Sequence, residues 1–120
     1  MNNVLIFLDD ERYPEDVTWI NYPEYDKVVI VRDSVNFKKN FHLYMMKETN
    51  SLVEVSFDHD IQDFFFDEET TGYDLLKWMV DYCFEWGYDI PECYFHTQNN
   101  VGKRNMESYY INAVKFQKEK

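Results

Sequence analysis

Acidic residues and histidines recur in this sequence at the ends of short apolar runs. They are Asp9 and Asp10 after residues 4–8, Asp58, His59 and Asp60 after residues 52–57, and His96 at the end of residues 92–96. Carboxylates are the ligands that hard divalent cations prefer, and imidazole donates or accepts a proton near neutral pH. If these runs are neighbouring strands, the pattern predicts a metal site that also contains acid–base groups.

Electrostatic repulsion favours a cation among three of these carboxylates. Two unit charges about 4 Å apart repel by roughly 4 kcal/mol at an effective dielectric constant near 20, so Asp9, Asp10 and Asp58 require compensation. A carboxylate set without a thiolate suits Mg²⁺ or Mn²⁺ better than zinc. The alternative is that one acid is protonated, or that Arg12 and Arg32 neutralise the carboxylates. We favour the metal.

Two of the three histidines are candidates for proton transfer. His59 lies between two aspartates, and His96 ends the last apolar run. A nearby carboxylate would hold the imidazole in one tautomer, so we expect one of the two to act as general acid or base. The sequence does not choose between them. His42, within a predicted helix, is assigned a structural role.

The start of the last predicted helix combines features of an anion site. Its backbone N–H groups are unpaired, the helix dipole is positive there, and two basic residues follow. The phosphate-binding candidates are Asn99, Asn100, Gly102, Lys103, Arg104 and Asn105 in this segment, with Arg12 and Arg32 from the strand ends. The alternative is an ordinary helix start with two solvated basic residues.

The hydrophobic pattern predicts the elements that position these residues. We expect strands at 4–8, 28–31, 52–57 and 92–96, with loops at 13–26, containing at most a short helix at 17–20, and at 61–70. We expect one helix capped by Ser34 that runs to about residue 47. A second is expected from the Thr71 and Asp74 capping box to Gly87, with Leu75, Leu76, Met79, Tyr82, Cys83 and Trp86 on its apolar face. A third is expected to be capped by Asn99 or Asn100, with Met106, Tyr109 or Tyr110, Ala113 and Phe116 on its inner face. This order predicts a three-layer α/β sandwich with a mostly parallel four-stranded sheet, whose carboxyl edge binds ligands.

Within the loop at 61–70, the run Phe64, Phe65 and Phe66 has two interpretations. The rings are expected either to stack on a base as a lid or to pack the loop onto the domain. We favour packing for at least two of them.

Composition limits the classes of function. A chain of 120 residues with 45% hydrophobic and 19% aromatic residues suits a single folded domain over 1–120 and excludes a disordered chain. The net charge of −11 argues against binding to bulk duplex nucleic acid. The apolar runs are too short to cross a bilayer, no leader is evident, and Cys83 and Cys93 form neither a disulfide framework nor a zinc motif. We therefore expect a cytoplasmic protein with two core thiols and no membrane partner.

Five motifs resemble a known family along nearly the whole chain. They are LDDERYP at residues 8–14, VR at 31–32, SFDHD at 56–60, TGYD at 71–74 and HTQNNVGKRNM at 96–106. This set is similar to the cyclic-phosphate-processing receiver-like family and, more distantly, to response-regulator receiver domains. Two departures are Ile61-Gln62, where the family usually has Leu-Gly, and Thr97 in place of Ser, which preserves the hydroxyl.

The resemblance implies a receiver- or flavodoxin-like fold and the processing of cyclic phosphates, and our leading hypothesis is a small metal-dependent phosphoesterase. Its substrate would be a cyclic phosphate on a small nucleotide or an RNA end. The residues to which the resemblance assigns roles are Asp9, Asp10, Arg12, Asp58, His59, Asp60, His96, Asn99 and Asn105. Combined with the site chemistry, this leads us to expect Mg²⁺ or Mn²⁺ on Asp9, Asp10 and Asp58, and proton transfer by His59 and His96. The heavy use of Asn, Lys, Tyr and Phe also resembles products of large tailed bacteriophages, which would place the protein in the host cytoplasm.

Three other functions compete with hydrolysis. A binding module would capture a cyclic nucleotide or phosphorylated end without turnover, for example to blunt a host defence signal. A signalling receiver would accept a phosphoryl group on Asp58, but no fifth strand ending in lysine is predicted. The His59-Asp60 pair is also found in all-helical metal phosphohydrolases, and its position after a β-patterned run argues against that class.

Overall fold

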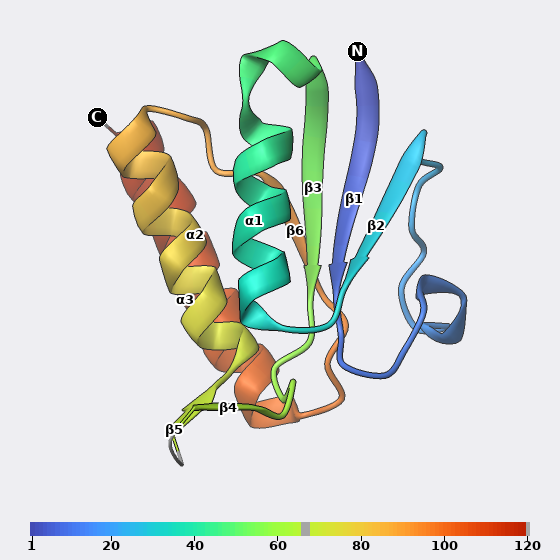
Figure 1. Cartoon of the computed structure of the whole chain (residues 1–120). Coiled ribbons are helices and arrows are strands. Elements are labelled where there is room, and N and C mark those ends of the chain that lie inside the picture. The colour runs from blue at the N-terminus through green and yellow to red at the C-terminus, as the bar shows by residue number, and fades with distance from the viewer. Residues whose placement is uncertain (66–67, 120) are drawn as a thin grey trace.

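A parallel sheet of four strands forms the centre of the protein (Figure 1). The spatial order is β2 (Lys27–Val31), β1 (Asn2–Leu8), β3 (Ser51–Phe57) and β6 (Glu92–Phe95), and every neighbouring pair is parallel. This computed structural model describes residues 1–65 and 68–119, without the side chains of Lys47 and Phe65. The predicted α/β class with a four-stranded parallel sheet is confirmed, and the arrangement agrees with a receiver- or flavodoxin-like fold.

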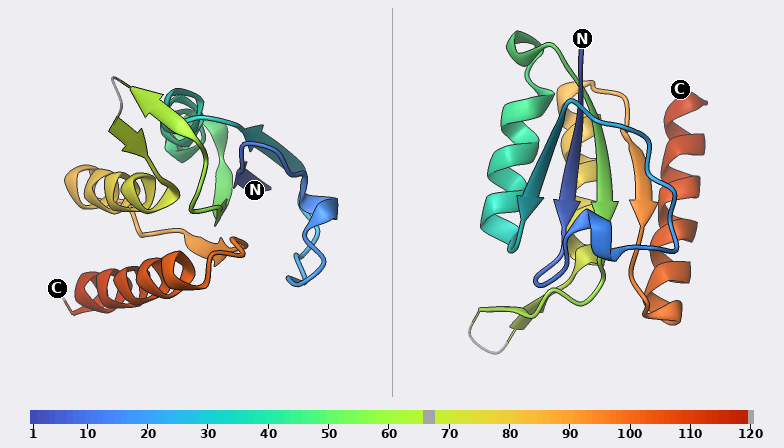
Figure 2. Two further views of the ribbon diagram at one scale, coloured as in Figure 1. Left: turned by 90° about the horizontal axis from the view of Figure 1, so that it is seen from below. Right: turned by 90° about the vertical axis from the view of Figure 1, so that its right-hand side faces the viewer.

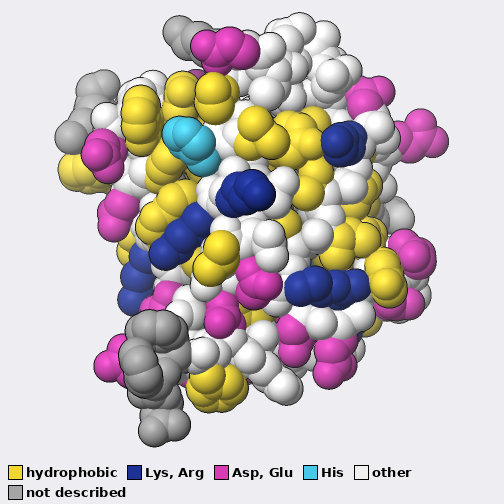
Figure 3. All heavy atoms as spheres, in the orientation of Figure 1, with side chains coloured by type: hydrophobic (Ala, Val, Ile, Leu, Met, Phe, Trp, Pro, Cys, Tyr) yellow, Lys and Arg dark blue, Asp and Glu magenta, His cyan; other side chains and the backbone are white. Residues whose placement is uncertain are grey.

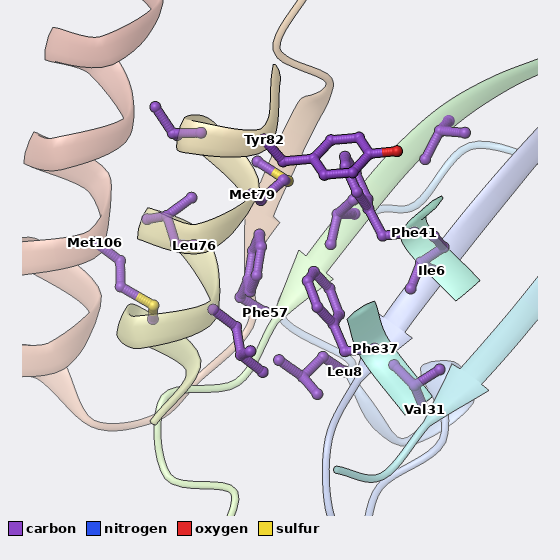
Figure 4. Packing of buried hydrophobic residues seen from close by; sticks show 14 of the residues in the cluster. Ile6, Leu8, Val31, Phe37, Phe41, Phe57, Leu76, Met79, Tyr82 and Met106 are labelled. Carbon is purple, nitrogen blue, oxygen red and sulfur yellow. The ribbon is translucent and has the colours of Figure 1, made fainter. Parts of the chain in front are cut away.

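Helices cover one face of this sheet. Figure 2 shows α1 (Ser34–Met45), α2 (Gly72–Trp86) and α3 (Asn100–Lys118) on the same side, with α3 packed against α2 beside β6. The main core lies between them and the sheet, and Figure 4 shows Phe37, Phe57, Met79 and Met106 packed in it. The predicted three-layer sandwich would have helices on both faces of the sheet. Because α3 lies on the same side as α1 and α2, no long helix among the described residues covers the other face.

The opposite face is covered by the connection between β1 and β2. Its short 3-10 helix η1 (Pro14–Asp16) replaces the helix expected at 17–20. Val17 and Tyr22 from this connection pack on Leu5 and Phe7 of β1, which makes a second, smaller core. Strand β1 is therefore buried on both sides, as its continuous apolar run predicts.

The helix ends mostly follow the expected signals. The Thr71 and Asp74 capping box opens α2, Gly87 ends it at φ 72°, and the side chain of Asn99 caps α3. The predicted cap of α1 was wrong, because Asp33 rather than Ser34 accepts the backbone N–H of Asn36 at 2.8 Å. A second 3-10 helix, η2 (Lys47–Thr49), follows α1.

The segment predicted as a loop at 61–70 contains a small hairpin. Strands β4 (Asp63–Phe65) and β5 (Glu68–Thr70) pair in antiparallel fashion. The carboxylate of Asp63 accepts the N–H of Ser34 at 2.8 Å, which ties the hairpin to the start of α1. Phe64 is 62% exposed, while the side chain of Phe65 and all of Phe66 lie outside the described residues. The expectation that at least two of the three rings pack onto the domain therefore stays a prediction.

Two aromatic residues predicted to face the core are instead exposed. Trp86 is 56% exposed because it is the last residue of α2, and Phe116 is 55% exposed in the last turns of α3, where its ring contacts Phe84. Cys83 is buried as expected, and Cys93 is partly buried. None of the helices in the described part of the chain has the length and apolar character needed to span a membrane.

Candidate functional site

Three polar side chains meet where the strands end at the same level. Asp9, Asp58 and His96 each follow the last residue of a strand, and the preceding residues Leu8, Phe57 and Phe95 are register partners in the main core. Side chains alternate between the two faces of a strand, so the next residue in each case turns away from the helices. The backbone ladder continues through them, since the N–H of Asp58 bonds to the carbonyl oxygen of Leu8 and that of His96 to the carbonyl oxygen of Phe57.

These three residues form a buried cluster of possible metal ligands. One ligand atom from each lies within 4.8 Å of the others, and the residues are 1%, 6% and 0% exposed, in the order Asp9, Asp58 and His96. Figure 2, left, looks onto this end of the sheet. The convergence of Asp9 and Asp58 is as the sequence predicts, and His96 joins them.

His96 is held rigidly by contacts on both ring nitrogens. Its Nε2 lies 3.0 Å from Oδ2 of Asp9, and its Nδ1 lies 2.7 Å from Oγ of Ser56, which in turn lies 2.7 Å from the hydroxyl of Tyr22. The imidazole also stacks on the ring of Phe7, with centroids 4.4 Å apart. Neither Ser56 nor Tyr22 was assigned a role from the sequence, although alternation along β3 places Ser56 on the face opposite the helices.

The carboxylate of Asp9 is stabilised in its ionised form. Burial alone would raise its pKa, but the contact with His96 and the N–H groups of Arg12 and Glu11 outweigh this and lower the pKa to about 2. The guanidinium of Arg12 is farther away, with Nη1 3.5 Å from Oδ2 of Asp9. Arg12 therefore neutralises the cluster only weakly.

Asp58 is in the opposite electrostatic situation. Burial and the nearby charge of Asp9 raise its pKa, although hydrogen bonds from the Thr97 hydroxyl and the N–H of His59 act the other way. Two carboxylates with oppositely shifted pKa values in one buried cluster are typical of functional sites. An added positive charge would relieve the penalty on Asp58.

The stability of the metal-free protein is expected to depend on Asp9 in acid. Its folded-state pKa of about 2 is below the usual 3.8, so the ionised form stabilises the fold above about pH 4, by on the order of 2 kcal/mol. This contribution is lost as the pH falls from about 4 toward 2. Urea unfolding with a chelator should show a free-energy gap between wild type and Asp9→Asn that narrows over this range. A gap that stays constant with pH would contradict the assignment.

The donor set fits a divalent metal ion. The 3.0 Å separation between Nε2 of His96 and Oδ2 of Asp9 matches adjacent ligands of an octahedral ion with bonds of about 2.1 Å. Two carboxylates and one imidazole suit Mn²⁺ better than Mg²⁺, since nitrogen donors favour transition metals. Asp10, expected as a third ligand, is not part of the cluster among the described residues.

A polar pocket of about 220 Å³ opens beside the cluster. Its charged lining consists of Asp9, Asp10, Glu11, Asp58 and Asp60, with Arg12 as the cation. Burial, followed by the charges of the neighbouring acids, raises the pKa of Asp10. The strands of the sheet end at the bottom of the view in Figure 1, and Figure 3 shows acidic and basic side chains close together at that end. The pocket is strongly acidic, so binding an anion there requires added positive charge.

His59 belongs to a separate group at the rim of the pocket. Its Nδ1 lies 2.8 Å from Oδ1 of Asp60, and the amide of Asn99 donates to Oδ2 of Asp60 at 3.0 Å. Although burial raises the pKa of Asp60, these two hydrogen bonds lower it overall. Gly102 is needed here for packing, since a Cβ atom would lie 2.6 Å from the His59 ring.

The remaining phosphate-binding candidates lie outside the described lining of the pocket. Arg32 donates to the backbone carbonyl oxygens of Asp9 and Arg12 at 3.1 and 2.6 Å, so its guanidinium holds the loop after β1. The other four are Asn100, Lys103, Arg104 and Asn105, in the first turns of α3. The structure thus separates the cluster at the strand ends from most of the basic segment.

Two further residues near the site carried no functional expectation. The indole N–H of Trp19 donates to the carbonyl oxygen of His96 at 3.0 Å. Gly72 lies against the backbone of Asp58, where a Cβ atom would come 1.7 Å from the carbonyl oxygen. The TGYD motif was the only sequence signal that included Gly72, and no signal in the sequence linked Trp19 to His96.

Comparison with known proteins agrees with the motifs and the geometry. The family model described as the cyclic-phosphate processing receiver domain matches residues 4–112. No curated protein and no solved structure matches the chain. The matched region contains β2, β3, β6, all of β1 except its first two residues, and the Asp9, Asp58 and His96 cluster. The protein therefore belongs to the cyclic-phosphate processing receiver domain family.

Proposed function

We propose that this protein is a metal-dependent phosphoesterase that opens a cyclic phosphate on a nucleotide or an RNA end. The observation that carries the proposal is the buried cluster of Asp9, Asp58 and His96. Two carboxylates in a buried site destabilise the fold unless a positive charge binds between them. The family to which the chain belongs processes cyclic phosphates, which provides the reaction class.

Asp9, Asp58 and His96 would hold the ion, with Mn²⁺ preferred over Mg²⁺. Bound there, a divalent ion supplies positive charge next to the phosphoryl oxygens and makes an attacking water more acidic. Ser56 orients His96 by its contact with Nδ1, and such supporting contacts typically tune a ligating imidazole. Arg12, which lines the pocket, contributes positive charge to the developing phosphorane.

Ring opening requires a proton for the departing ribose oxygen, and we assign its delivery to His59. Water adds to phosphorus and releases a proton to the solvent, one ester bond between phosphorus and a ribose oxygen breaks, and the ribose oxygen takes up a proton from His59. His59 contacts ionised Asp60, which fixes Nδ1 as the donor and leaves Nε2 for proton exchange. Both nitrogens of His96 are occupied in a fully buried position, so His96 is less suited to this role.

The proposal is tested by product analysis with and without metal. Purified protein incubated with 2′,3′-cyclic AMP and Mn²⁺ is expected to convert the cyclic phosphorus signal into that of a monoester in ³¹P NMR. A chelator is expected to reduce the rate at least about a hundredfold, because an ion of this kind contributes several kcal/mol to the barrier. Asp81→Asn, which removes an exposed carboxylate on α2, is the control for the loss of a carboxylate outside the site and is expected to hydrolyse the nucleotide at the wild-type rate.

Two outcomes would contradict the proposal. Equal hydrolysis in chelator would exclude the metal-dependent mechanism. Recovery of intact cyclic nucleotide after prolonged incubation with Mn²⁺, despite measurable binding, would identify a capture module in place of an enzyme.

A further inference from the structure

The pocket beside the acidic cluster holds only part of a nucleotide. Its volume of about 220 Å³ is below the roughly 300–1,000 Å³ of pockets that enclose whole small ligands. A phosphate group fits, while a ribose and base must lie on the surface around the opening. The residues next to the opening therefore determine which cyclic phosphates bind.

Trp19 is anchored to two residues of the site, His96 and Arg12. It lies in the connection between β1 and β2, and its side chain is 40% exposed. Its indole N–H donates to the backbone carbonyl oxygen of His96 at 3.0 Å. An exposed ring with a fixed position loses little conformational entropy when a ligand stacks on it.

Arg12 connects Trp19 to the pocket. Its guanidinium carbon lies over the indole ring, 5.5 Å from the centroid. The same guanidinium donates to Oε1 of Gln98 at 3.2 Å and contacts Oδ2 of Asp9 at 3.5 Å, and both of these residues line the pocket. A continuous surface thus runs from the acidic cluster through a planar cation to an aromatic ring.

Charge alone provides little affinity for an anionic ligand here. Five carboxylates line the pocket, and Arg12 is the one cation among its described lining residues. The chain also has a net charge of −11. A base that stacks on an aromatic ring or a guanidinium plane gains affinity without needing a positively charged pocket, and the gain does not depend on which base is bound.

We infer that Trp19 and Arg12 form a stacking platform for the base of a nucleoside 2′,3′-cyclic phosphate whose phosphate enters the acidic pocket. This inference rests on the proposed function and adds the residues that recognise the base of the substrate, Trp19 and Arg12. Free nucleotides and RNA 3′ ends share this chemistry. A comparison of 2′,3′-cyclic AMP with a short oligoribonucleotide ending in the same group distinguishes the two sources.

The experiment compares a probe with a base and a probe without one. The probes are 2′,3′-cyclic AMP and glycerol 1,2-cyclic phosphate, and KM and kcat are measured with Mn²⁺. Trp19→Ala is expected to lower the preference for the nucleotide over the glycerol compound at least about fivefold, mainly through KM, because stacking contributes roughly 1–3 kcal/mol per base. Trp19→Phe keeps a ring and is expected to retain most of the preference. Trp86→Ala, at an exposed tryptophan on α2, is the matched control.

A second readout is independent of turnover. With Mg²⁺ present, adenosine 2′-monophosphate, which has no cyclic ester left to hydrolyse, is expected to quench the tryptophan fluorescence of wild type and of Trp86→Phe, but not that of Trp19→Phe. If Trp19→Ala lowers kcat/KM equally for both probes, the inference is overturned and the proposed function stays intact, because Trp19 would then act through His96. Failure of wild type to bind or hydrolyse either probe would overturn the proposed function, and the stacking platform with it.

Discussion

Replacing Asp58 by asparagine is expected to stabilise the metal-free protein and to abolish its response to Mn²⁺. Burial and the charge of Asp9 raise the pKa of Asp58, so the folded protein favours the neutral form. The stability that neutral Asp58 allows is lost as the pH rises through its folded-state pKa. At neutral pH the ionised Asp58 side chain therefore destabilises the fold. Asparagine has the same shape without the charge. Its carbonyl oxygen can still accept the N–H of His59.

Thermal unfolding at neutral pH measures both parts of this prediction. In chelator, Asp58→Asn should unfold at a higher temperature than wild type. With Mn²⁺ at about 100 times its dissociation constant, wild type should gain about 2.7 kcal/mol, or roughly 10 °C, whereas the variant should gain little. Turnover should fall at least about a hundredfold in the variant.

Asp81→Asn again controls for the loss of one negative charge from the protein. It should leave the Mn²⁺ response at the wild-type value. A destabilised Asp58→Asn in chelator would show that Asp58 does not carry the unfavourable charge. A variant that retains the full Mn²⁺ shift would show that Asp58 does not hold the ion.

Replacing Gly72 by alanine is expected to destabilise the fold by about 3 kcal/mol or more. A Cβ atom at this position would lie 1.7 Å from the carbonyl oxygen and 2.8 Å from the carbonyl carbon of Asp58. These are backbone atoms, so no side-chain rotation relieves the overlap. The N–H of Gly72 also donates to the carbonyl oxygen of His59 at 2.7 Å, so separating the segments would break this hydrogen bond.

Gly87→Ala is the matched control, because it tests backbone strain without a steric overlap. Gly87 has φ 72°, and a Cβ atom there would meet nothing within 4 Å, so alanine should cost only about 1–2 kcal/mol. Urea unfolding compares the two variants, and Mn²⁺-dependent stabilisation should be retained in Gly87→Ala and reduced in Gly72→Ala. Equal stability of Gly72→Ala and wild type would mean that α2 shifts without disturbing Asp58.

Local patterns were sufficient to predict the four strands of the parallel sheet and most helix ends. Apolar, β-branched runs predict buried strands, and the capping residues Thr71 and Asn99 act over three residues along the chain. The hairpin at 63–70 was not predicted, because two three-residue strands rich in Phe and acidic residues are too short to show alternation. The cap of α1 was misassigned by one position, since Asp33 and Ser34 are both favourable capping residues.

The convergence of Asp9 and Asp58 was predicted because both follow strands of one parallel sheet. The choice between the two histidines was not predictable by the same argument. His96 joins the acids because Phe95 is level with Phe57 in the register, and alternation then directs His96 to the same side as Asp58. His59, one residue farther from its strand, lies against Gly102.

The sequence by itself determined that this is an α/β domain with carboxylates and histidines at one edge of a parallel sheet, because those properties depend on local hydrophobic pattern and strand order. Only the tertiary structure decided that His96 completes the cluster, that Arg32 holds a loop, and that Trp19 bonds to the backbone of His96. These relations depend on strand register and on contacts between residues far apart in the chain, such as the 77-residue separation between Trp19 and His96. No local pattern encodes contacts of that range.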